Sequence, residues 1–232
     1  MVRTTCALIC AYNEEKAIRN IAKSTQRYVN EVVVIDDGST DETIGEALMG
    51  GARIMTHSYN KGKGAAMMTG FEYFLSSSYD NIVALDGDGQ HLPKDIPLFE
   101  ETLNKGYDAV IGHRDFKGDK IPISRKLGNK LDSKILSYIL KTNLPDPQNG
   151  FRMFTKPTIE KFFNNSKKSG FSFEIEMLIN MAVEEANIGW VPIATIYDAE
   201  IKSHIKPWQH IKNSINTYKY AKRKIKEKRK QK

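Results

Sequence analysis

The sequence has little cysteine and no long apolar run, and each scarcity excludes a class of protein. Its two cysteines, Cys6 and Cys10, fall in one short apolar stretch. Four extended residues separate them by roughly 13 Å, which is beyond disulfide reach and favours a reducing, cytoplasmic setting. No run approaches the ~20 apolar residues of a membrane-spanning helix, and no secretory signal is apparent. We therefore expect a soluble or peripheral protein without structural disulfides.

The sequence also lacks net positive charge outside one segment. The 232 residues carry a net charge of +7, but the stretch 219–232 alone holds nine Lys or Arg and one acid, which leaves −1 for the rest. We therefore divide the chain into a globular domain, 1–206, and a basic amphipathic C-terminal helix or tail, 207–232. A nucleic-acid-binding protein is the alternative that the tail suggests. Because a tail alone gives unspecific, salt-sensitive binding, we expect no specific nucleic acid.

Short apolar runs alternate with helical patterns through the first half of the chain. This alternation predicts an α/β fold with a doubly wound, mostly parallel sheet flanked by helices, whose ligands bind beyond the carboxyl ends of the strands. The second half is less regular, with helical patterns at 124–141 and 171–186, a turn into a strand at 144–154 and a strand at 188–197. The expected strands of the first half are 4–11, 31–35, 52–57, 81–85 and 108–113.

Polar side chains follow four of these strands directly. The segments "AYNEE", "DDGSTD", "DGDGQH" and "HRD" come after the first, second, fourth and fifth strands. In the third of them, Asp86 and Asp88 offer two neighbouring carboxylates, the hard oxygen ligands that suit Mg²⁺ or Mn²⁺. An ordinary Asp-Gly turn is the alternative. Repulsion between the two carboxylates favours a site for a cation that carries an anionic ligand.

Two further segments indicate a nucleotide. Asp41 is explained as a helix N-cap, but Asp36 and Asp37 at a buried strand end suggest donors from a base or ribose. The segment "NKGKGAAMMTG" lacks the Lys-Ser or Lys-Thr of a Walker motif, although a glycine-rich helix start beside Lys61 and Lys63 attracts a diphosphate. Near the same edge, surface solvation is one reading of Arg114, Arg125 and Arg152. The other is a second phosphate site.

In this order and at these spacings, "AYNEE", "DDGSTD" and "DGDGQH" resemble family 2 glycosyltransferases of the GT-A fold. With "NKGKGAAMMTG", "GHR" and "NGFRMF" added, the chain is most similar to the dolichyl-phosphate mannose or glucose synthase branch, over roughly residues 4–206. The family usually has proline where Cys10 stands here.

The resemblance implies roles for individual residues. It implies a metal site at Asp86, Asp88 and Gln90, and catalytic roles for Asp88, Arg114 and Arg125, the two arginines near the acceptor phosphate. The donor-binding residues that it implies are Cys10, Tyr12, Glu14, Ile35, Asp37, Asp86, Gly87 and Lys202.

The implied reaction is a metal-dependent, inverting transfer of a sugar from a nucleoside-diphosphate sugar to a polyprenyl phosphate. Such an acceptor is largely dianionic near neutral pH and needs no general base. The alternative is a soluble transferase that acts on a hydroxyl, for which Asp146 is the candidate base. The cofactor is Mg²⁺ or Mn²⁺ in either case.

The C-terminal segment predicts contact with a membrane. A helix over 207–230 places Trp208, Ile211, Ile215, Tyr218 and Ile225 along one stripe, with basic residues crowding its end. Such a helix lies on an anionic membrane surface, here the inner, cytoplasmic face. Packing on the domain as an ordinary last helix is the alternative.

Overall fold

The computed structural model describes residues 3–114, 123–163, 173–194 and 207–231, and within these the side chains of 123–126 and 207–211 are not described. Seven strands form one sheet in the order β3-β2-β1-β4-β6-β5-β7. All neighbouring strands are parallel except where β6 pairs with β4 and β5. The strands are β1 Thr5–Ala11, β2 Glu31–Asp36, β3 Arg53–Thr56, β4 Asn81–Asp86, β5 Ala109–Arg114, β6 Arg152–Thr155 and β7 Ile188–Ile193.

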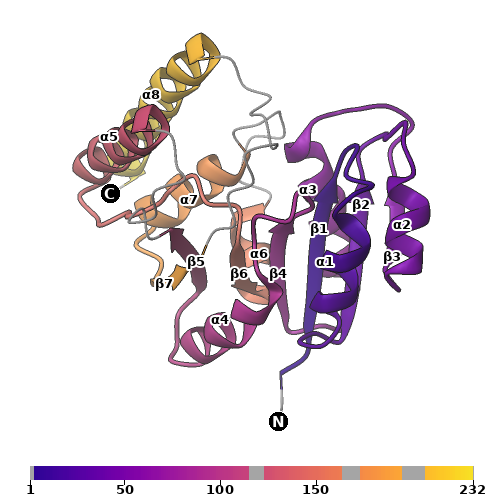
Figure 1. The fold of residues 1–232 in the computed structure, drawn as a ribbon. Helices are drawn as coiled ribbons and strands as arrows, with labels where there is room; N and C mark the ends of the chain where they lie inside the picture. Colours follow the sequence, from indigo (N-terminus) through magenta and orange to yellow (C-terminus); the bar gives the residue numbers. More distant parts are fainter. Residues whose placement is uncertain (1–2, 115–122, 164–172, 195–206, 232) are drawn as a thin grey trace.

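Helices cover both faces of this sheet (Figure 1). One core cluster joins the sheet to α1, α2 and α4, and a second joins it to α3, α6 and α7. Because the central strands are buried on both faces, they read as continuous apolar runs such as "EVVVI". The helices are α1 Ile18–Thr25, α2 Thr43–Met49, α3 Lys63–Ser76, the 3-10 turn η1 Pro93–Asp95, α4 Ile96–Leu103, α5 Ile123–Leu140, α6 Lys156–Phe163, α7 Phe173–Val183 and α8 Pro207–Gln231.

The doubly wound, mostly parallel α/β fold expected from the sequence is confirmed, with two differences in the second half. The strand β6 lies antiparallel between β4 and β5, so the strand after the turn at 144–151 enters the centre of the sheet. The short helix α6 follows it directly and was not expected from the sequence. The insertion matters for function because it carries the turn 146–150 to the carboxyl end of β4.

The C-terminal helix α8 packs on α5 and α7 through a third cluster, which includes buried Tyr220 and Ala221. The expected apolar stripe lies only partly on the packing face, since Tyr218 is half-buried against this cluster. Ile215 is exposed, and the Tyr218 hydroxyl donates a hydrogen bond to Asp132 of α5. The side chains of Trp208 and Ile211 lie outside the described residues. No helix among the described residues is long and apolar enough to cross a membrane.

Candidate active site

The carboxyl ends of β1, β2 and β4 meet at one edge of the sheet. Cys10 lies beside Asp86 in the register of β1 and β4, and the Gly87 N–H donates to the Cys10 carbonyl at 3.1 Å. The Asp37 N–H donates to the Ala11 carbonyl at 2.9 Å. A side chain at position 87 would lie 3.0 Å from that Cys10 carbonyl, so glycine lets the two strand ends stay close. The first, second and fourth strands thus bring their polar ends together as expected.

Asp86, the last residue of β4, lies in a chain of opposite charges. Its carboxylate pairs with the Lys63 ammonium, which also lies 3.0 Å from a Glu174 oxygen, and His91 Nδ1 is 3.8 Å away. Burial alone raises the pKa of Asp86, but the positive charge of Lys63 outweighs it and brings that pKa to about 2. Asp86 is therefore an anion at any physiological pH.

Asp88 lies two residues further on, where its carboxylate accepts hydrogen bonds from Gln90. The Gln90 backbone N–H donates to Oδ1 at 3.0 Å and the side-chain amide to Oδ2 at 2.8 Å. Burial, and then the negative charge of Asp86, raise the pKa of Asp88. A bound cation would relieve this repulsion. Two carboxylates and an amide oxygen fit the hard-ligand preference of Mg²⁺ or Mn²⁺, which complete their shells with water and phosphate oxygens.

This site differs from one built by protein ligands alone. Within the described ranges, no group of three or more His, Cys, Asp or Glu side chains is arranged to hold a metal ion.

Glu14 faces the same negative centre from the loop after β1. Burial, and then the charges of Asp88 and Asp86, raise the pKa of Glu14 to about 7. The loop is tied to α2, because the Glu14 N–H donates to the Thr43 hydroxyl at 2.7 Å. Two residues earlier, Tyr12 is 43% exposed, so its ring is open to a ligand above the strand ends.

Replacing Glu14 by Gln should change how stability depends on pH. With a folded-state pKa near 7 and an unfolded value near 4.5, ionisation of Glu14 costs stability increasingly as pH rises through that window. We expect the gain in free energy of unfolding of Glu14→Gln over wild type to be larger at pH 8 than at pH 4.5. Urea unfolding with chelator present measures it. A gain that shrinks with rising pH would contradict the assignment.

Asp37 uses its carboxylate to shape the segment that leads into α3. It accepts hydrogen bonds from the backbone N–H groups of Lys61 and Gly62 at 3.0 and 2.7 Å, and His57 Nδ1 lies 2.7 Å away. Asp37 therefore holds in place the backbone segment that precedes Lys63. The side chain of Ile35, in the preceding strand, is fully buried in the core.

Arg114 and Asp146 form a buried pair at the end of β5. The Arg114 Nε and one terminal nitrogen each donate to a different Asp146 oxygen at 2.7 Å, and the Arg114 backbone N–H donates as well at 3.1 Å. Only 1% of the Asp146 side chain is exposed, against 15% for Arg114. The carboxylate is thus engaged on both oxygens, while the guanidinium keeps part of its surface open.

The interpretation of Arg152 as a phosphate ligand is wrong. Its guanidinium is fully buried and donates to three backbone carbonyls, those of Asn149, Pro147 and Glu174, at 2.7 to 2.8 Å. Arg152 therefore fixes the turn 146–150 from a position closed to solvent. Lys202 lies outside the described residues, as does the side chain of Arg125, whose backbone lies in the first turn of α5.

Sequence reasoning missed three contributors to the site. Glu174 and His91 flank Lys63 and Asp86; His91 ends the segment "DGDGQH" but was given no role, and nothing in the local sequence of Glu174 separates it from an ordinary helix residue. Gly150 is the third, since a Cβ there would lie 2.7 Å from an Asp86 oxygen and 2.9 Å from Lys63 Nζ. Its signal was the "NGF" turn, whose approach to Asp86 depends on the antiparallel insertion of β6.

The mostly parallel sheet with acidic strand ends has the GT-A architecture. The chain belongs to the family described as glycosyl transferase family 2, whose model matches residues 6–163, and it is an enzyme of that family. The resemblance recognised in the sequence is confirmed.

Two proteins of known activity and one crystal structure are similar to this chain. The UDP-N-acetylglucosamine–dolichyl-phosphate N-acetylglucosaminyltransferase of Methanococcus voltae is 31% identical over 215 residues, covering 82% of this chain and 84% of that protein. The undecaprenyl-phosphate mannosyltransferase of Micrococcus luteus is 30% identical over 176 residues, covering 72% of each. Glucosyl-3-phosphoglycerate synthase from Mycobacterium tuberculosis, crystallised with Mn²⁺ and UDP, shares the fold with a TM-score of 0.74 at 19% identity, covering 96% of this chain and 80% of that one.

Proposed function

We propose that the protein transfers a sugar from a nucleoside-diphosphate sugar to a polyprenyl phosphate at an anionic membrane surface, with inversion at the anomeric carbon. The pairing of Asp146 with Arg114 carries the proposal. A hydroxyl acceptor needs a base, and both oxygens of the candidate base, Asp146, are held by a guanidinium. A phosphate acceptor with a second pKa of about 6 needs no base. The names of the relatives from Methanococcus voltae and Micrococcus luteus also support a lipid phosphate.

On the donor side, Asp86 and Asp88, with the Gln90 amide, would hold Mg²⁺ or Mn²⁺. The bound ion supplies Lewis-acid neutralisation of the charge that grows on the leaving diphosphate. Lys63 adds a fixed positive charge beside Asp86, at the start of α3 where backbone N–H groups favour phosphate. Asp37 orders that helix start, and Tyr12 and Glu14 lie at the end of β1 for the nucleoside. Attack in a single displacement inverts the anomeric configuration.

The choice of acceptor in a transfer assay distinguishes the proposed function from that of a transferase acting on a hydroxyl. With radiolabelled nucleotide sugars and Mg²⁺ or Mn²⁺ supplied, we expect label to enter organic solvent when polyprenyl phosphate is present. The matched control is the corresponding polyprenol, identical except for its hydroxyl, and we expect no transfer to it. Transfer to polyprenol or to water-soluble hydroxyls at a similar rate would favour the hydroxyl-acting transferase instead.

Two variants of one ion pair refine the same assay. Arg114→Gln removes the cation, whereas Asp146→Asn keeps it and removes only its buried partner. If Arg114 also faces the acceptor phosphate, we expect Arg114→Gln to raise the KM for polyprenyl phosphate about tenfold or more beyond Asp146→Asn, with nucleotide affinity unchanged. Arg125→Gln is expected to behave like Arg114→Gln. Equal losses in Arg114→Gln and Asp146→Asn would mean that Arg114 serves only to hold Asp146.

A further inference from the structure

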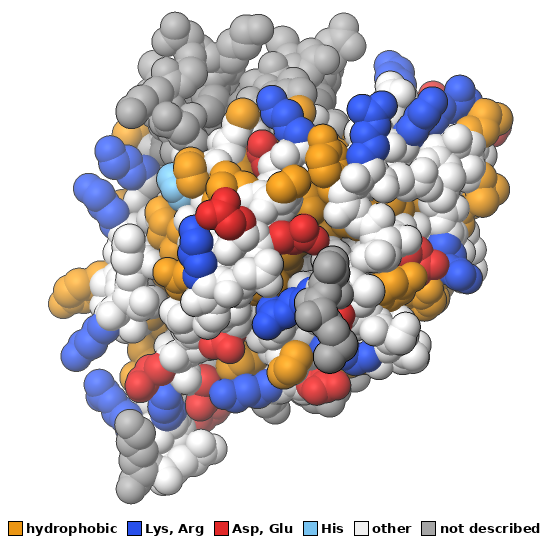
Figure 2. All heavy atoms as spheres, turned by 90° about the horizontal axis from the view of Figure 1, so that it is seen from below, with side chains coloured by type: hydrophobic (Ala, Val, Ile, Leu, Met, Phe, Trp, Pro, Cys, Tyr) orange, Lys and Arg blue, Asp and Glu red, His pale blue; other side chains and the backbone are white. Residues whose placement is uncertain are grey.

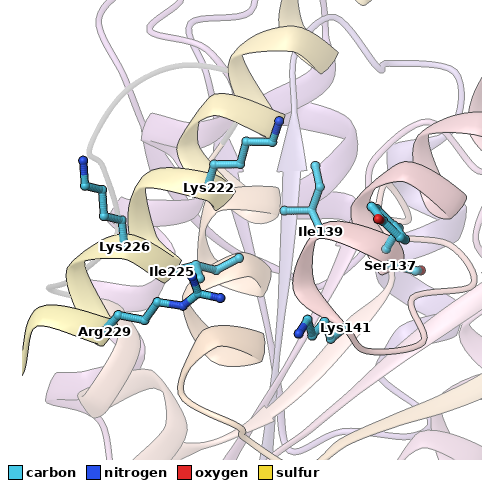
Figure 3. A pocket seen from close by; sticks show the side chains of 8 residues that line it. Ser137, Ile139, Lys141, Lys222, Ile225, Lys226 and Arg229 are labelled. Atoms are coloured by element: carbon cyan, nitrogen blue, oxygen red, sulfur yellow. The ribbon is translucent and has the colours of Figure 1, made fainter. Parts of the chain in front are cut away.

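A groove of about 730 Å³ lies between the C-terminal end of α5 and the last turns of α8. Figure 3 shows Ile139 and Ile225 between the two helices, with Lys222, Lys226 and Arg229 along the α8 side. Lys141, just after α5, adds a fourth cation to the lining. The groove thus combines an apolar floor with a rim of one charge.

The cations of this rim differ from Arg223, Lys224 and Lys228, which lie in the same turns of α8. Arg223 and Lys224 pair with Glu227, and Lys228 pairs with Glu184 and Glu185. In contrast, none of the four rim cations has an acidic partner in the part of the chain that the structure describes. The lower face of the molecule, seen in Figure 2, instead shows acidic and basic side chains intermingled. Lys222, Lys226 and Arg229 therefore bring unbalanced positive charge of α8 to the groove.

An exposed apolar stripe on α5 leads toward this groove. Leu127, Leu131 and Tyr138 are 62%, 59% and 86% exposed, although the next residues, Ile139 and Leu140, pack against the third core cluster. Spacings of four and seven residues place the three exposed side chains on one side of the helix. A row of large apolar side chains beside a cationic groove favours binding of a partner that has both apolar and anionic parts.

The two helices are held in fixed register. Asp132 of α5 accepts hydrogen bonds from the Ser214 hydroxyl at 3.0 Å and from the Tyr218 hydroxyl, both on α8. Residues 137–141 then lie beside 222–229, so the helices run side by side in the same direction (Figure 1). Tyr138 belongs both to the exposed stripe of α5 and to the groove lining, so the stripe adjoins the cations of α8.

We infer that α5 and α8 together form a docking surface for an anionic phospholipid membrane, with α5 supplying apolar insertion and the groove cations binding lipid phosphates. This differs from an anchor made by the C-terminal helix alone, because the Tyr218 hydroxyl of α8 is committed to Asp132. Basic side chains attract anionic headgroups while apolar ones enter the acyl boundary. The inference rests on the proposed function only for the reason to bind a membrane, which is that a lipid acceptor lies in a bilayer.

Vesicle co-sedimentation without nucleotide or acceptor tests the surface separately from catalysis. We expect the full chain to bind vesicles that contain an anionic phospholipid and to bind zwitterionic vesicles weakly. The triple variant Lys222→Gln, Lys226→Gln and Arg229→Gln should bind anionic vesicles roughly a hundredfold more weakly at low salt, from three lost cation contacts. The pair Leu127→Ser and Leu131→Ser should lose roughly tenfold at any salt, because its contribution is apolar.

The control keeps the same loss of net charge at exposed positions away from the groove. It combines Lys23→Gln, Arg27→Gln and Lys105→Gln, and should bind vesicles like wild type. Thermal unfolding verifies that every variant is folded. Wild-type binding by the groove variant, or an equal loss in the control, would overturn the inference. So would retention of an oligonucleotide by the groove cations when no form of the protein sediments with vesicles.

Discussion

Asp88→Asn is expected to reduce sugar transfer by a factor of about a hundred or more while leaving the fold intact. The substitution removes one of two carboxylates that would hold the divalent ion, and a single charge-stabilising group typically contributes that much. The folded state should not suffer, because burial and Asp86 already disfavour the charge of Asp88 and raise its pKa. Initial rates of transfer at saturating metal and donor measure the loss. Circular dichroism and thermal unfolding check the fold.

Two controls make this result specific. Chelator should abolish transfer by the wild-type enzyme, and added Mg²⁺ or Mn²⁺ should restore it. Asp95→Asn is a matched variant, since Asp95 is also a carboxyl with a raised pKa but lies in η1, outside the strand ends. It should retain transfer. Full activity of Asp88→Asn, or of wild type in chelator, would exclude the metal assignment.

Arg152→Met is expected to lower the free energy of unfolding by about 3 to 5 kcal/mol, as does breaking other buried charged networks. The substitution keeps an apolar stem of similar length but leaves the carbonyls of Pro147, Asn149 and Glu174 without their donor. Each buried acceptor left unpaired costs about 1 to 3 kcal/mol. Urea unfolding monitored by fluorescence measures the change.

Arg53→Met is the matched control for this stability effect. Arg53 pairs with the Glu31 carboxylate at 2.8 Å, and its side chain is 57% exposed. Surface ion pairs contribute about 1 kcal/mol or less, so we expect the loss to be correspondingly small. Similar losses in the two variants would show that the three carbonyl contacts of Arg152 add little.

The first half of the molecule could be predicted from the sequence because its signals are local. Continuous apolar strands followed by polar ends indicate a parallel sheet, and parallel strands bring Asp86, Asp88 and Glu14 to one edge by topology alone. The structure places those side chains close enough to shift the pKa of Glu14. No tertiary information beyond strand direction was needed.

The second half depended on contacts that no local pattern carries. Arg152 begins a strand and is typical of a surface arginine, yet it is buried because β6 enters the middle of the sheet. The same insertion brings Gly150 against Asp86. On α8, the periodicity of Ile215 and Tyr218 indicated an apolar face, but packing buries Tyr220 and Ala221, places Tyr218 against the same cluster and leaves Ile215 exposed. Helical spacing alone does not distinguish between adjacent faces of one helix.

Asp132 connects the C-terminal helix to the turn beside the candidate active site. Besides its bonds to α8, it accepts a hydrogen bond from the Gln148 amide at 2.7 Å, within the turn that carries Asp146 and Gly150. The last helix therefore supports the turn at the candidate active site. A chain that ended after Tyr218 would also lack Tyr220 and Ala221, which are buried. Loss of activity or vesicle binding on such truncation would therefore reflect lost packing of α8. Substitution of the groove cations leaves that packing in place and tests the proposed lipid contact by itself.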